Sequence, residues 1–244
     1  MSQLQGKLAI VTGASRGIGR AIAHSLAQLG AHVILCARDT AKLHQLADEL
    51  KSQGLSAENA TCDVTRPQDW EALAAGIKQR HHGKLDILIN NAGDGVFGKP
   101  LHETSLEDWT RTIDTNLKGV YLGIKTMAPL MIANGGGDIV NIASLAAKNP
   151  VKNGAAYAAS KWGLNGLSVS AAEELREYNI RVSTVCPGST ATNLILDMRR
   201  ANSKDADTSR MLQPSDIAHA VVTLVTQAPQ SFISELLIRP TRKP

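Results

Sequence analysis

The sequence is poor in aromatic residues and in cysteine. Phe, Trp and Tyr together make up 3% of the 244 residues, whereas hydrophobic residues of all kinds make up 43%. A chain of this length and hydrophobic content can bury a substantial core, which must then be mostly aliphatic. The three cysteines, Cys36, Cys62 and Cys186, are too few and too far apart for a disulfide framework or a cysteine-based metal site. We expect buried, reduced thiols, as in a protein of the reducing cytoplasm.

The sequence also lacks long apolar runs and a strong charge of either sign. No run approaches the roughly 18 apolar residues that span a membrane, and residues 1–7 lack the apolar stretch of a signal peptide. The net charge of +4 is small and dispersed, which argues against a nucleic-acid partner and slightly favours anionic small molecules. The seven histidines, including the pair His81–His82, show no spacing typical of a zinc site. We therefore expect a cytoplasmic protein with no metal, no membrane partner and no nucleic-acid partner.

The sequence does contain a glycine-rich turn between a strand and a helix. Leu8–Val11 predicts a buried strand, apolar residues at helical spacing begin at position 18, and His32–Cys36 predicts a second strand. The glycines between the first strand and the helix match one spacing variant of the dinucleotide-binding turn, where the helix N-terminus attracts a pyrophosphate. A glycine-rich turn without a ligand is the alternative. The candidate cofactor contacts in this turn are Gly13, Ser15, Arg16, Gly17, Ile18 and Gly19.

The residues after the second predicted strand favour NADPH (NADP) over NADH. NAD-binding turns usually carry Asp or Glu roughly 20 residues beyond the glycines, where it binds the ribose 2′-hydroxyl. Here Ala37 and Arg38 occupy that position. Arg38 and Arg16 are permanent cations that can hold a 2′-phosphate. Asp39 is a competing ribose ligand, and either arginine alone could be a solvated surface charge.

Strands and helices alternate along the rest of the chain. Seven short strands that alternate with helices predict a single α/β domain over residues 1–244, with a doubly wound (Rossmann) parallel sheet and helices on both faces. Ligands of such sheets bind beyond the carboxyl ends of the strands. Residues 191–213 are polar and irregular, and we expect a mobile substrate lid there. The further elements are expected near residues 41–53, 57–62, 67 onward, 86–90, 106–133, 138–143, 154–178, 180–186, 214–226 and 235–238.

Three side chains in the middle of the chain suggest proton-transfer chemistry. Tyr157 and Lys161 are four residues apart in a predicted helix and so share a face, while Ser144 ends the preceding strand. A nearby ammonium stabilises a phenolate and lowers a tyrosine pKa of about 10 by roughly one to three units. The serine hydroxyl can fix a carbonyl oxygen beside the phenol. In isolation, the Tyr–Lys pair could also be a chance pair on a surface helix.

Over nearly its whole length the sequence resembles the short-chain dehydrogenase/reductase family. The matching motifs agree jointly in order and spacing: Thr12-Gly13-x-x-x-Gly17-x-Gly19, Asp63, Asn90-Asn91-Ala92-Gly93, Asn116, Ser144, Tyr157-x-x-x-Lys161 and Pro187-Gly188. The resemblance implies that Tyr157 is the general acid in ketone reduction and that Ser144 orients the substrate carbonyl. It implies that Lys161 holds the nicotinamide ribose and lowers the Tyr157 pKa. Asn116 would support a water in a proton relay behind Lys161.

The same resemblance assigns further cofactor contacts. Asp63 and Val64 would contact the adenine. Asn91, Ala92 and Gly93 would line the adenosine side, and Pro187, Gly188 and Thr190 the nicotinamide side. Asn116 could instead only tie strands together. The family also implies a homo-oligomer, either a tetramer or a dimer.

The branch that the sequence resembles most is that of the 3-oxoacyl-thioester (acyl carrier protein) reductases. The chain departs from it at residues 236–244, where that branch has a glycine-rich strand and tail, so substrate class and quaternary structure stay open. If the lid is helical, Leu194, Ile195 and Met198 share an apolar face, with Arg199 and Arg200 nearer the rim. This would suit an acyl thioester; an ordinary amphipathic lid is the alternative. An NAD-dependent alcohol dehydrogenase, a general ketone reductase and a dinucleotide-sensing protein are the other functions considered.

Overall fold

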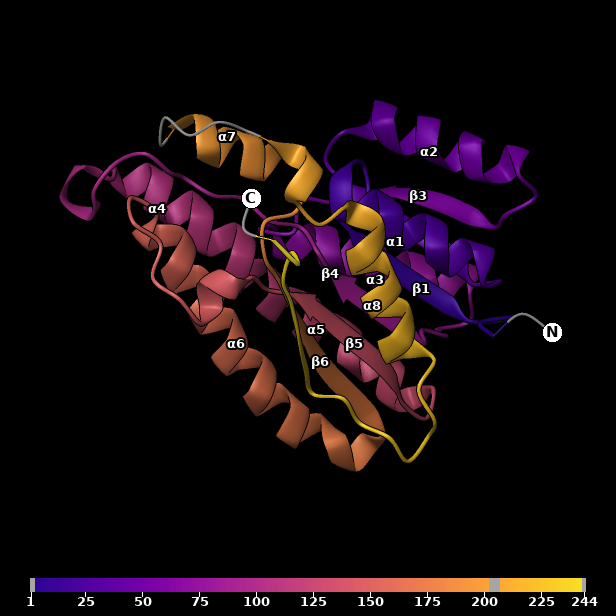
Figure 1. The fold of residues 1–244 in the computed structure, drawn as a ribbon. Helices are drawn as coiled ribbons and strands as arrows, with labels where there is room; N and C mark the ends of the chain where they lie inside the picture. Colours follow the sequence, from indigo (N-terminus) through magenta and orange to yellow (C-terminus); the bar gives the residue numbers. More distant parts are fainter. Residues whose placement is uncertain (1–2, 202–206, 243–244) are drawn as a thin grey trace.

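The protein is a three-layer α/β structure with one parallel sheet in the middle (Figure 1). The computed structural model describes residues 3–201 and 207–242. The seven strands lie in the order β3-β2-β1-β4-β5-β6-β7, so the predicted fold class is confirmed. Their bounds are β1 Leu8–Thr12, β2 His32–Ala37, β3 Ala57–Thr61, β4 Ile87–Asn90, β5 Gly137–Ile142, β6 Ile180–Pro187 and β7 Glu235–Ile238. The order reverses between β1 and β4, which is the point where doubly wound sheets bind ligands.

Helices cover both faces of the sheet (Figure 1). Strand β1 shows why: Ala9 and Val11 pack into one apolar cluster, while Leu8 and Ile10 pack into the other, because successive strand residues point to opposite faces. The first cluster includes buried residues of α1, α2 and α8, and the second those of α3, α5 and α6. The helices are α1 Gly17–Gln28, α2 Thr40–Ser52, α3 Pro67–Arg80, α4 Leu106–Ile113, α5 Gly119–Ala133, α6 Ala155–Leu175, α7 Asn193–Ala201 and α8 Pro214–Val225.

The predicted long helix over residues 106–133 is interrupted by one wider turn. Helix α4 runs into a π-helical turn at Asp114–Lys118, which continues directly into α5. Pro129 lies inside α5 and does not end it, since the helix continues to Ala133. Short 3-10 turns complete the chain: η1 Leu101–Glu103, η3 Leu145–Ala147, η4 Arg176–Tyr178 and η5 Thr208–Arg210. Single π-helical turns are frequent at functional sites, and this one contains the candidate residue Asn116.

The predicted irregular lid is more regular than expected. Its first half forms α7 and a later part forms η5, while residues 202–206 lie outside the described residues. Leu194, Ile195 and Met198 are each partly buried, so α7 has an apolar stripe that the high average polarity of the segment conceals. This stripe favours a helix where composition alone suggests a loop.

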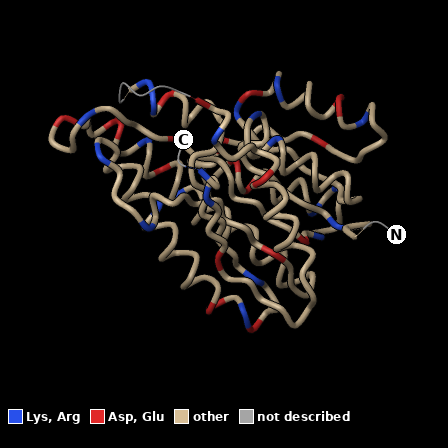
Figure 2. Tube along the Cα trace, in the orientation of Figure 1, with Lys and Arg blue, Asp and Glu red and all other residues tan. Residues whose placement is uncertain are grey.

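The charged residues are dispersed over the structure and the cysteines are buried, as the sequence composition suggests. Figure 2 shows Lys and Arg interspersed with Asp and Glu along the trace, without a large block of one sign. Cys36, Cys62 and Cys186 are buried and form no disulfide. Among the described residues, no helix has the length and apolar character that crossing a membrane requires.

Candidate active site

A cavity of about 670 Å³ opens at the carboxyl end of the sheet. The segments that follow β1 to β6 all contribute to its wall. With two exceptions, Gly19 and Asn116, every catalytic or cofactor-binding residue proposed from the sequence lines this cavity. Those residues are Gly13, Ser15, Arg16, Gly17, Ile18, Arg38, Asp63, Val64, Asn91, Ala92, Gly93, Ser144, Tyr157, Lys161, Pro187, Gly188 and Thr190.

The glycine turn after β1 has the backbone shape that its sequence predicts. Gly13 and Gly17 adopt φ values of +65° and +56°, a region that side chains disfavour. Gly19 does not line the cavity, because it packs under the turn: a Cβ there would overlap the carbonyl oxygen of Gly13. The turn therefore leads into the N-terminus of α1 with its backbone close to the cavity, where an anion is attracted by the helix dipole.

Three positively charged side chains lie at the end of the cavity nearest β2. Arg16 and Arg38 both line it, as does Lys42, which the sequence reasoning missed. Lys42 lies in the first turn of α2, four residues after Arg38, and that spacing on the turn after the second strand is the signal that could have identified it. Asp39, the predicted competing ligand, caps α2: its carboxylate accepts hydrogen bonds from the backbone N–H of Lys42 at 3.1 Å and from its ammonium at 2.6 Å. These hydrogen bonds lower the pKa of Asp39.

The turns after β3 and β4 are held by side chain–backbone hydrogen bonds. The Asp63 carboxylate accepts the backbone N–H and the hydroxyl of Thr65 at 3.0 and 2.8 Å. The Asn91 amide donates to the carbonyl oxygen of Thr12 at 2.8 Å, which ties the end of β4 to the end of β1. The walls formed by Val64 and by Ala92 and Gly93 are therefore fixed by their own turns.

Ser144, Tyr157 and Lys161 meet at the other end of the cavity. Ser144 precedes η3, and its hydroxyl oxygen accepts the backbone N–H of Ala146 at 3.1 Å. Tyr157 and Lys161 lie on one face of α6, and both side chains are buried. The Lys161 ammonium lies 5.8 Å from the centre of the Tyr157 ring and donates a 2.8 Å hydrogen bond to the carbonyl oxygen of Ile142.

The Tyr157 pKa differs from the sequence-based expectation. Burial raises the pKa of the Tyr157 phenol above its ordinary value, while a hydrogen bond with the Ser144 side chain acts in the opposite direction. Burial also lowers the pKa of Lys161 to about 8. Lys161 was expected to lower the Tyr157 pKa, but its ammonium is directed to the Ile142 carbonyl and is itself desolvated. In this structure desolvation by burial is the largest cause of both pKa shifts.

Asn116 lies behind the cavity wall, completely buried in the π-helical turn. Its side-chain amide donates to the carbonyl oxygen of Asp94 at 2.8 Å and to the hydroxyl of Ser160 at 2.9 Å. Its oxygen accepts the backbone N–H of Asp94 at 2.8 Å. Asn116 thus joins the loop after β4 to α6, whereas the alternative considered for it was a link between strands. The relay role behind Lys161 stays a prediction.

The segment after β6 forms the remaining wall. The Thr190 hydroxyl donates to the carbonyl oxygen of Gly188 at 3.0 Å, and Leu194 and Ile195 of α7 line the cavity. Met198, which was expected beside them, does not line it. A residue that sequence reasoning missed is Phe97, whose ring lies 5.1 Å from that of Tyr157. It is one of only two phenylalanines in the chain, which could have drawn attention to it.

Comparison with known proteins shows which family the chain belongs to. A family model described as short chain dehydrogenase matches residues 7–203. The chain belongs to the short-chain dehydrogenase family. Among solved structures, this short-chain dehydrogenase is similar to a metagenomic short-chain oxidoreductase in complex with NADP, at 50% identity and a TM-score of 0.86. That match covers 99% of this chain and 100% of the other.

Two named relatives act on different kinds of molecule. This short-chain dehydrogenase is 43% identical, over 187 residues, to a protein from Streptomyces violaceoruber named as a candidate ketoacyl reductase of granaticin polyketide synthase. The match covers 76% of this chain and 68% of the relative. It is 38% identical, over 200 residues, to a trans-4-hydroxycyclohexanecarboxylate dehydrogenase from Sinomonas cyclohexanicum, covering 80% of this chain and 76% of the relative. The family membership makes the protein an oxidoreductase, and the specific substrate is a separate question.

Proposed function

We propose that this short-chain dehydrogenase is an NADPH-dependent carbonyl reductase. The observation that carries the proposal is one cavity with Arg16 and Arg38 at one end and Tyr157 with Ser144 at the other. Cations at the adenosine end suit a 2′-phosphate, and a phenol with a hydroxyl beside it suits a carbonyl oxygen. A protein that only senses dinucleotides has no use for the second group.

The cavity offers a fitting residue for each part of the cofactor. The glycine turn and the N-terminus of α1 would hold the pyrophosphate, and Arg16, Arg38 and Lys42 the 2′-phosphate. Asp63 and Val64 would contact the adenine, and Asn91, Ala92 and Gly93 the rest of the adenosine. Lys161 would bind the nicotinamide ribose, while Pro187, Gly188 and Thr190 would line the nicotinamide. When bound, NADPH supplies the hydride.

The protein's own groups supply the proton. The raised pKa of Tyr157 keeps the phenol protonated at neutral pH, so that it can donate its proton to the oxygen of a carbonyl being reduced. The Ser144 hydroxyl would hold that oxygen beside the phenol. A water held near Asn116 would then return a proton to Tyr157 by way of Lys161. Carbonyl reduction and alcohol oxidation are the two directions of this step.

For the substrate we propose a 3-oxoacyl thioester under an α7 lid. Leu194 and Ile195 give the lid an apolar wall toward the cavity, and Arg199 and Arg200 make its outer part basic. The relative named as a ketoacyl reductase supports this class. The relative named as a hydroxycyclohexanecarboxylate dehydrogenase favours a second candidate, oxidation of a small hydroxy acid.

The test measures oxidation of NADPH in the presence of a panel of ketones and 3-oxoacyl thioesters, and the same assay is repeated with NADH. The reverse reaction is measured with NAD or NADP and a panel of alcohols. A reductase consumes NADPH with at least one carbonyl. Tight binding of NADPH without turnover of any of them would mean a dinucleotide-sensing protein, and preferential reduction of NAD by alcohols would mean an alcohol dehydrogenase.

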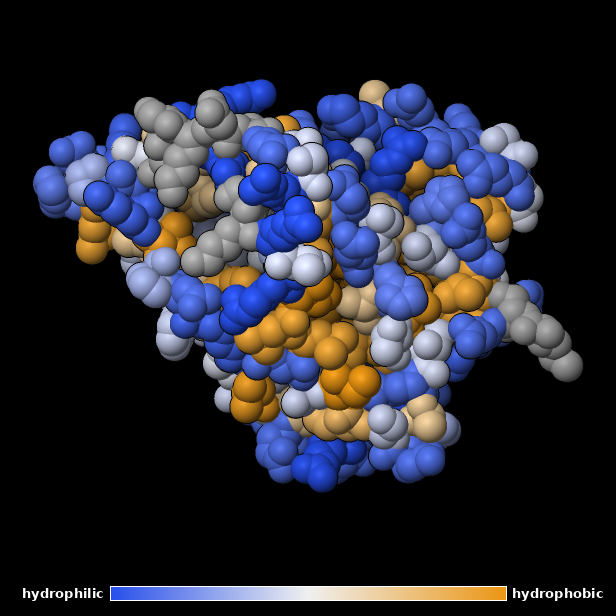
Figure 3. Space-filling view, viewed as in Figure 1, coloured by the Kyte–Doolittle hydropathy of each residue, from blue (hydrophilic) through white to orange (hydrophobic). Residues whose placement is uncertain are grey.

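We also propose that the protein is a homotetramer. Exposed apolar side chains lie on the outer surfaces of α5 and α6, where Tyr121, Trp162 and Val169 are exposed. A second apolar surface surrounds the edge strand β7, with Phe232 and Leu237 exposed, and Figure 3 shows orange residues gathered there. Two different self-complementary surfaces generate a tetramer with two-fold axes. Light scattering should give a tetramer that Trp162→Glu reduces to a dimer; a monomeric wild-type protein would refute this.

A further inference from the structure

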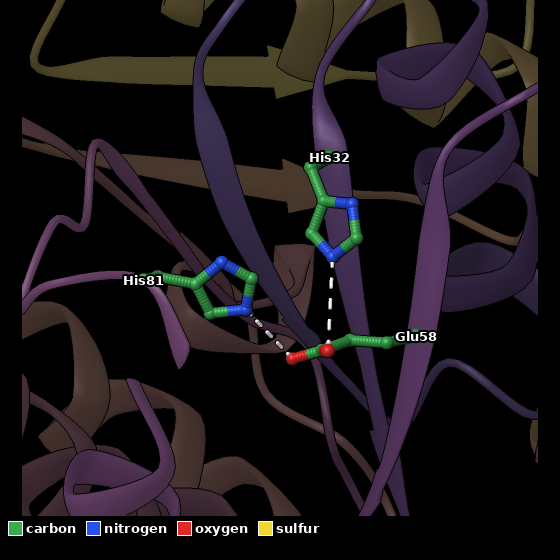
Figure 4. A group of neighbouring side chains, drawn as sticks. All are labelled: His32, Glu58 and His81. Carbon is green, nitrogen blue, oxygen red and sulfur yellow. Dashed lines mark hydrogen bonds and ion pairs between the residues drawn. The ribbon is translucent and has the colours of Figure 1, made fainter. Parts of the chain in front are cut away.

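Two histidines and a glutamate converge at the end of the sheet opposite the cavity described above (Figure 4). His32 is the first residue of β2, Glu58 lies in β3, and His81 follows the last residue of α3. The Glu58 carboxylate lies 3.0 Å from His81 Nε2 and 3.9 Å from His32 Nε2. One candidate ligand atom from each of the three residues lies within 4.8 Å of the other two. The six residues of β2 place this cluster roughly 20 Å from Arg38, at about 3.3 Å per residue.

The His32 ring has one nitrogen bound and one nitrogen orphaned. Its Nδ1 forms a 2.6 Å hydrogen bond with the hydroxyl of Ser56, whereas Nε2 is buried and has no hydrogen-bond partner. When Nδ1 carries the proton and donates it to Ser56, the lone pair of Nε2 faces Glu58. A histidine that binds a metal usually donates its other N–H to such a neighbouring oxygen, which fixes the ring.

The other two side chains are equally well placed. The backbone of His81 is fixed by its hydrogen bond to the carbonyl oxygen of Ile77 at 2.9 Å, and the turn that follows has positive φ at His82 and Gly83. The rings of His32 and His81 lie 5.1 Å apart, on the same side of the Glu58 carboxylate. His32 and His81 also line a second cavity of about 350 Å³, which gives water and ions a path to the cluster.

We propose that His32, Glu58 and His81 form a binding site for a divalent transition metal, with Zn²⁺ as the fitting ion. Zn²⁺ takes two imidazole nitrogens and a carboxylate oxygen at about 2.0–2.2 Å, which places tetrahedral ligands about 3.3–3.5 Å apart. The measured separations of 3.0 and 3.9 Å lie on either side of that range. A water from the second cavity completes the four ligands. The soft imidazoles exclude Mg²⁺ and Ca²⁺, which prefer oxygen ligands.

One cation of the protein competes for the same carboxylate. Arg80 Nη2 lies 3.3 Å from Glu58 Oε1, and its side chain is half-exposed, so it can turn into solvent when an ion binds. The two lysines beside the second cavity, Lys7 and Lys84, both pair with Asp86 instead. Bound metal would join β2, β3 and the end of α3. It would stabilise the fold there without entering the reaction.

The experiment is Zn²⁺ titration of the full chain, freed of any histidine tag, in competition with a coloured chelator. The wild-type protein should bind one Zn²⁺ at this site. His81→Gln and Glu58→Gln should weaken binding more than about 100-fold, and Ser56→Ala, which removes only the outer contact, about 10- to 100-fold. Arg80→Ala should tighten binding, because it removes the competing cation. The matched control is His82→Asn, which keeps a residue that tolerates positive φ and should leave the affinity unchanged.

Two further readouts do not depend on affinity alone. Co²⁺ bound in place of Zn²⁺ should give the absorption of a tetrahedral ion, and Zn²⁺ should raise the melting temperature of the wild-type protein and of His82→Asn but not of His81→Gln. The proposal is overturned if no single equivalent binds, if His81→Gln and Glu58→Gln bind as tightly as wild type, or if Arg80→Ala binds more weakly. Loss of binding in His82→Asn would equally place the ion elsewhere, on surface histidines.

Discussion

The carboxylate of Asp39 is bound by Lys42, three residues further along the chain. Its two oxygens accept hydrogen bonds from the Lys42 backbone N–H and ammonium at 3.1 and 2.6 Å. The acidic residue that follows β2 therefore caps α2, and it lines the cavity with its carboxylate already paired with Lys42. Arg16 and Arg38 line the same end of the cavity, so this end is complementary to a phosphate.

The first prediction is a preference for NADPH that depends on these arginines. A charged hydrogen bond contributes about 1.5–3 kcal/mol, so two of them should give a preference of tens-fold or more in kcat/KM. Arg38→Asp should reverse the preference by repelling the 2′-phosphate. Arg176→Ala, at the far end of α6, is the matched control and should leave it unchanged. Equal use of NADPH and NADH by the wild-type protein would contradict the arginine clamp.

The second prediction concerns the proton donor. Tyr157→Phe removes one hydroxyl but keeps the ring that packs against Phe97, so the fold and the affinity for NADPH should be retained. Loss of general acid catalysis should lower kcat about 10²- to 10⁴-fold. Tyr178→Phe, exposed in η4 after the end of α6, should behave like wild type. Steady-state kinetics and NADPH fluorescence titration measure the two quantities, and near-normal turnover by Tyr157→Phe would refute the assignment.

The third prediction links Lys161 to the pH dependence of stability. The pKa of folded Lys161 is lowered from 10.5 to about 8 by burial, so between these values the unfolded chain binds the additional proton. The contribution of Lys161 to the free energy of unfolding should therefore rise with pH in this window, whereas the raised pKa values of the three buried cysteines act in the opposite direction in both proteins that are compared. Relative to Lys161→Met, the gain should be about 1.4 kcal/mol per pH unit between pH 8 and 10.

Urea unfolding of the cofactor-free proteins at several pH values tests this relation. Lys78→Met is the matched control, because the Lys78 side chain is exposed on α3. Its difference from wild type should be constant across the window. A constant difference for Lys161→Met as well would mean that the folded protein does not expel the Lys161 proton.

The fourth prediction concerns the substrate and rests on the basic outer part of α7. Acetoacetyl-CoA should be reduced with a higher kcat/KM than the neutral ketone ethyl acetoacetate at low salt, and the difference should shrink as salt screens the charges. Replacing Arg199 and Arg200 together by alanine should also shrink it, whereas Arg176→Ala should not. If ethyl acetoacetate is reduced at least as well and salt has no effect, the protein is a general carbonyl reductase.

Most of the fold could be predicted because its strands are short, buried and separated by strong turn signals. The apolar runs at Leu8–Thr12 and Ile87–Asn90 are buried on both faces, so they are continuous in sequence. The alternation of these strands with helices then indicates the fold class. Residues 191–213 were expected to be irregular because of their average polarity, and the apolar face of Leu194, Ile195 and Met198 was considered only for the case of a helical lid, the case that α7 represents. The π-helical turn was also missed, because its wider hydrogen bonding leaves no mark in residue spacing.

The candidate site, like the fold, could be predicted from the sequence only in part. Residues that follow strand ends, such as Gly13, Asn91 and Ser144, could be brought together from topology alone, because parallel strands end at one edge of the sheet. Positions that depend on side-chain direction could not. Asn116 proved to lie behind the wall, and Phe97 reaches Tyr157 from a loop of no regular structure. The zinc-site histidines are 49 residues apart, and only the pairing of β2 with β3 and the end of α3 brings them together.

Helix α7 has no buried residue along its length. Side chains that are not buried contribute little to the free energy of unfolding, so substitutions in this helix should be nearly neutral for folding. Yet Leu194 and Ile195 face the cavity. With α7 as the proposed substrate lid, the part of the chain that meets the substrate would be separate from the part that stabilises the fold. A mutant library confined to Asn193–Ala201 should change which carbonyl compounds are accepted while the yield of folded protein stays constant, which makes this helix the natural place for both evolution and engineering to alter specificity.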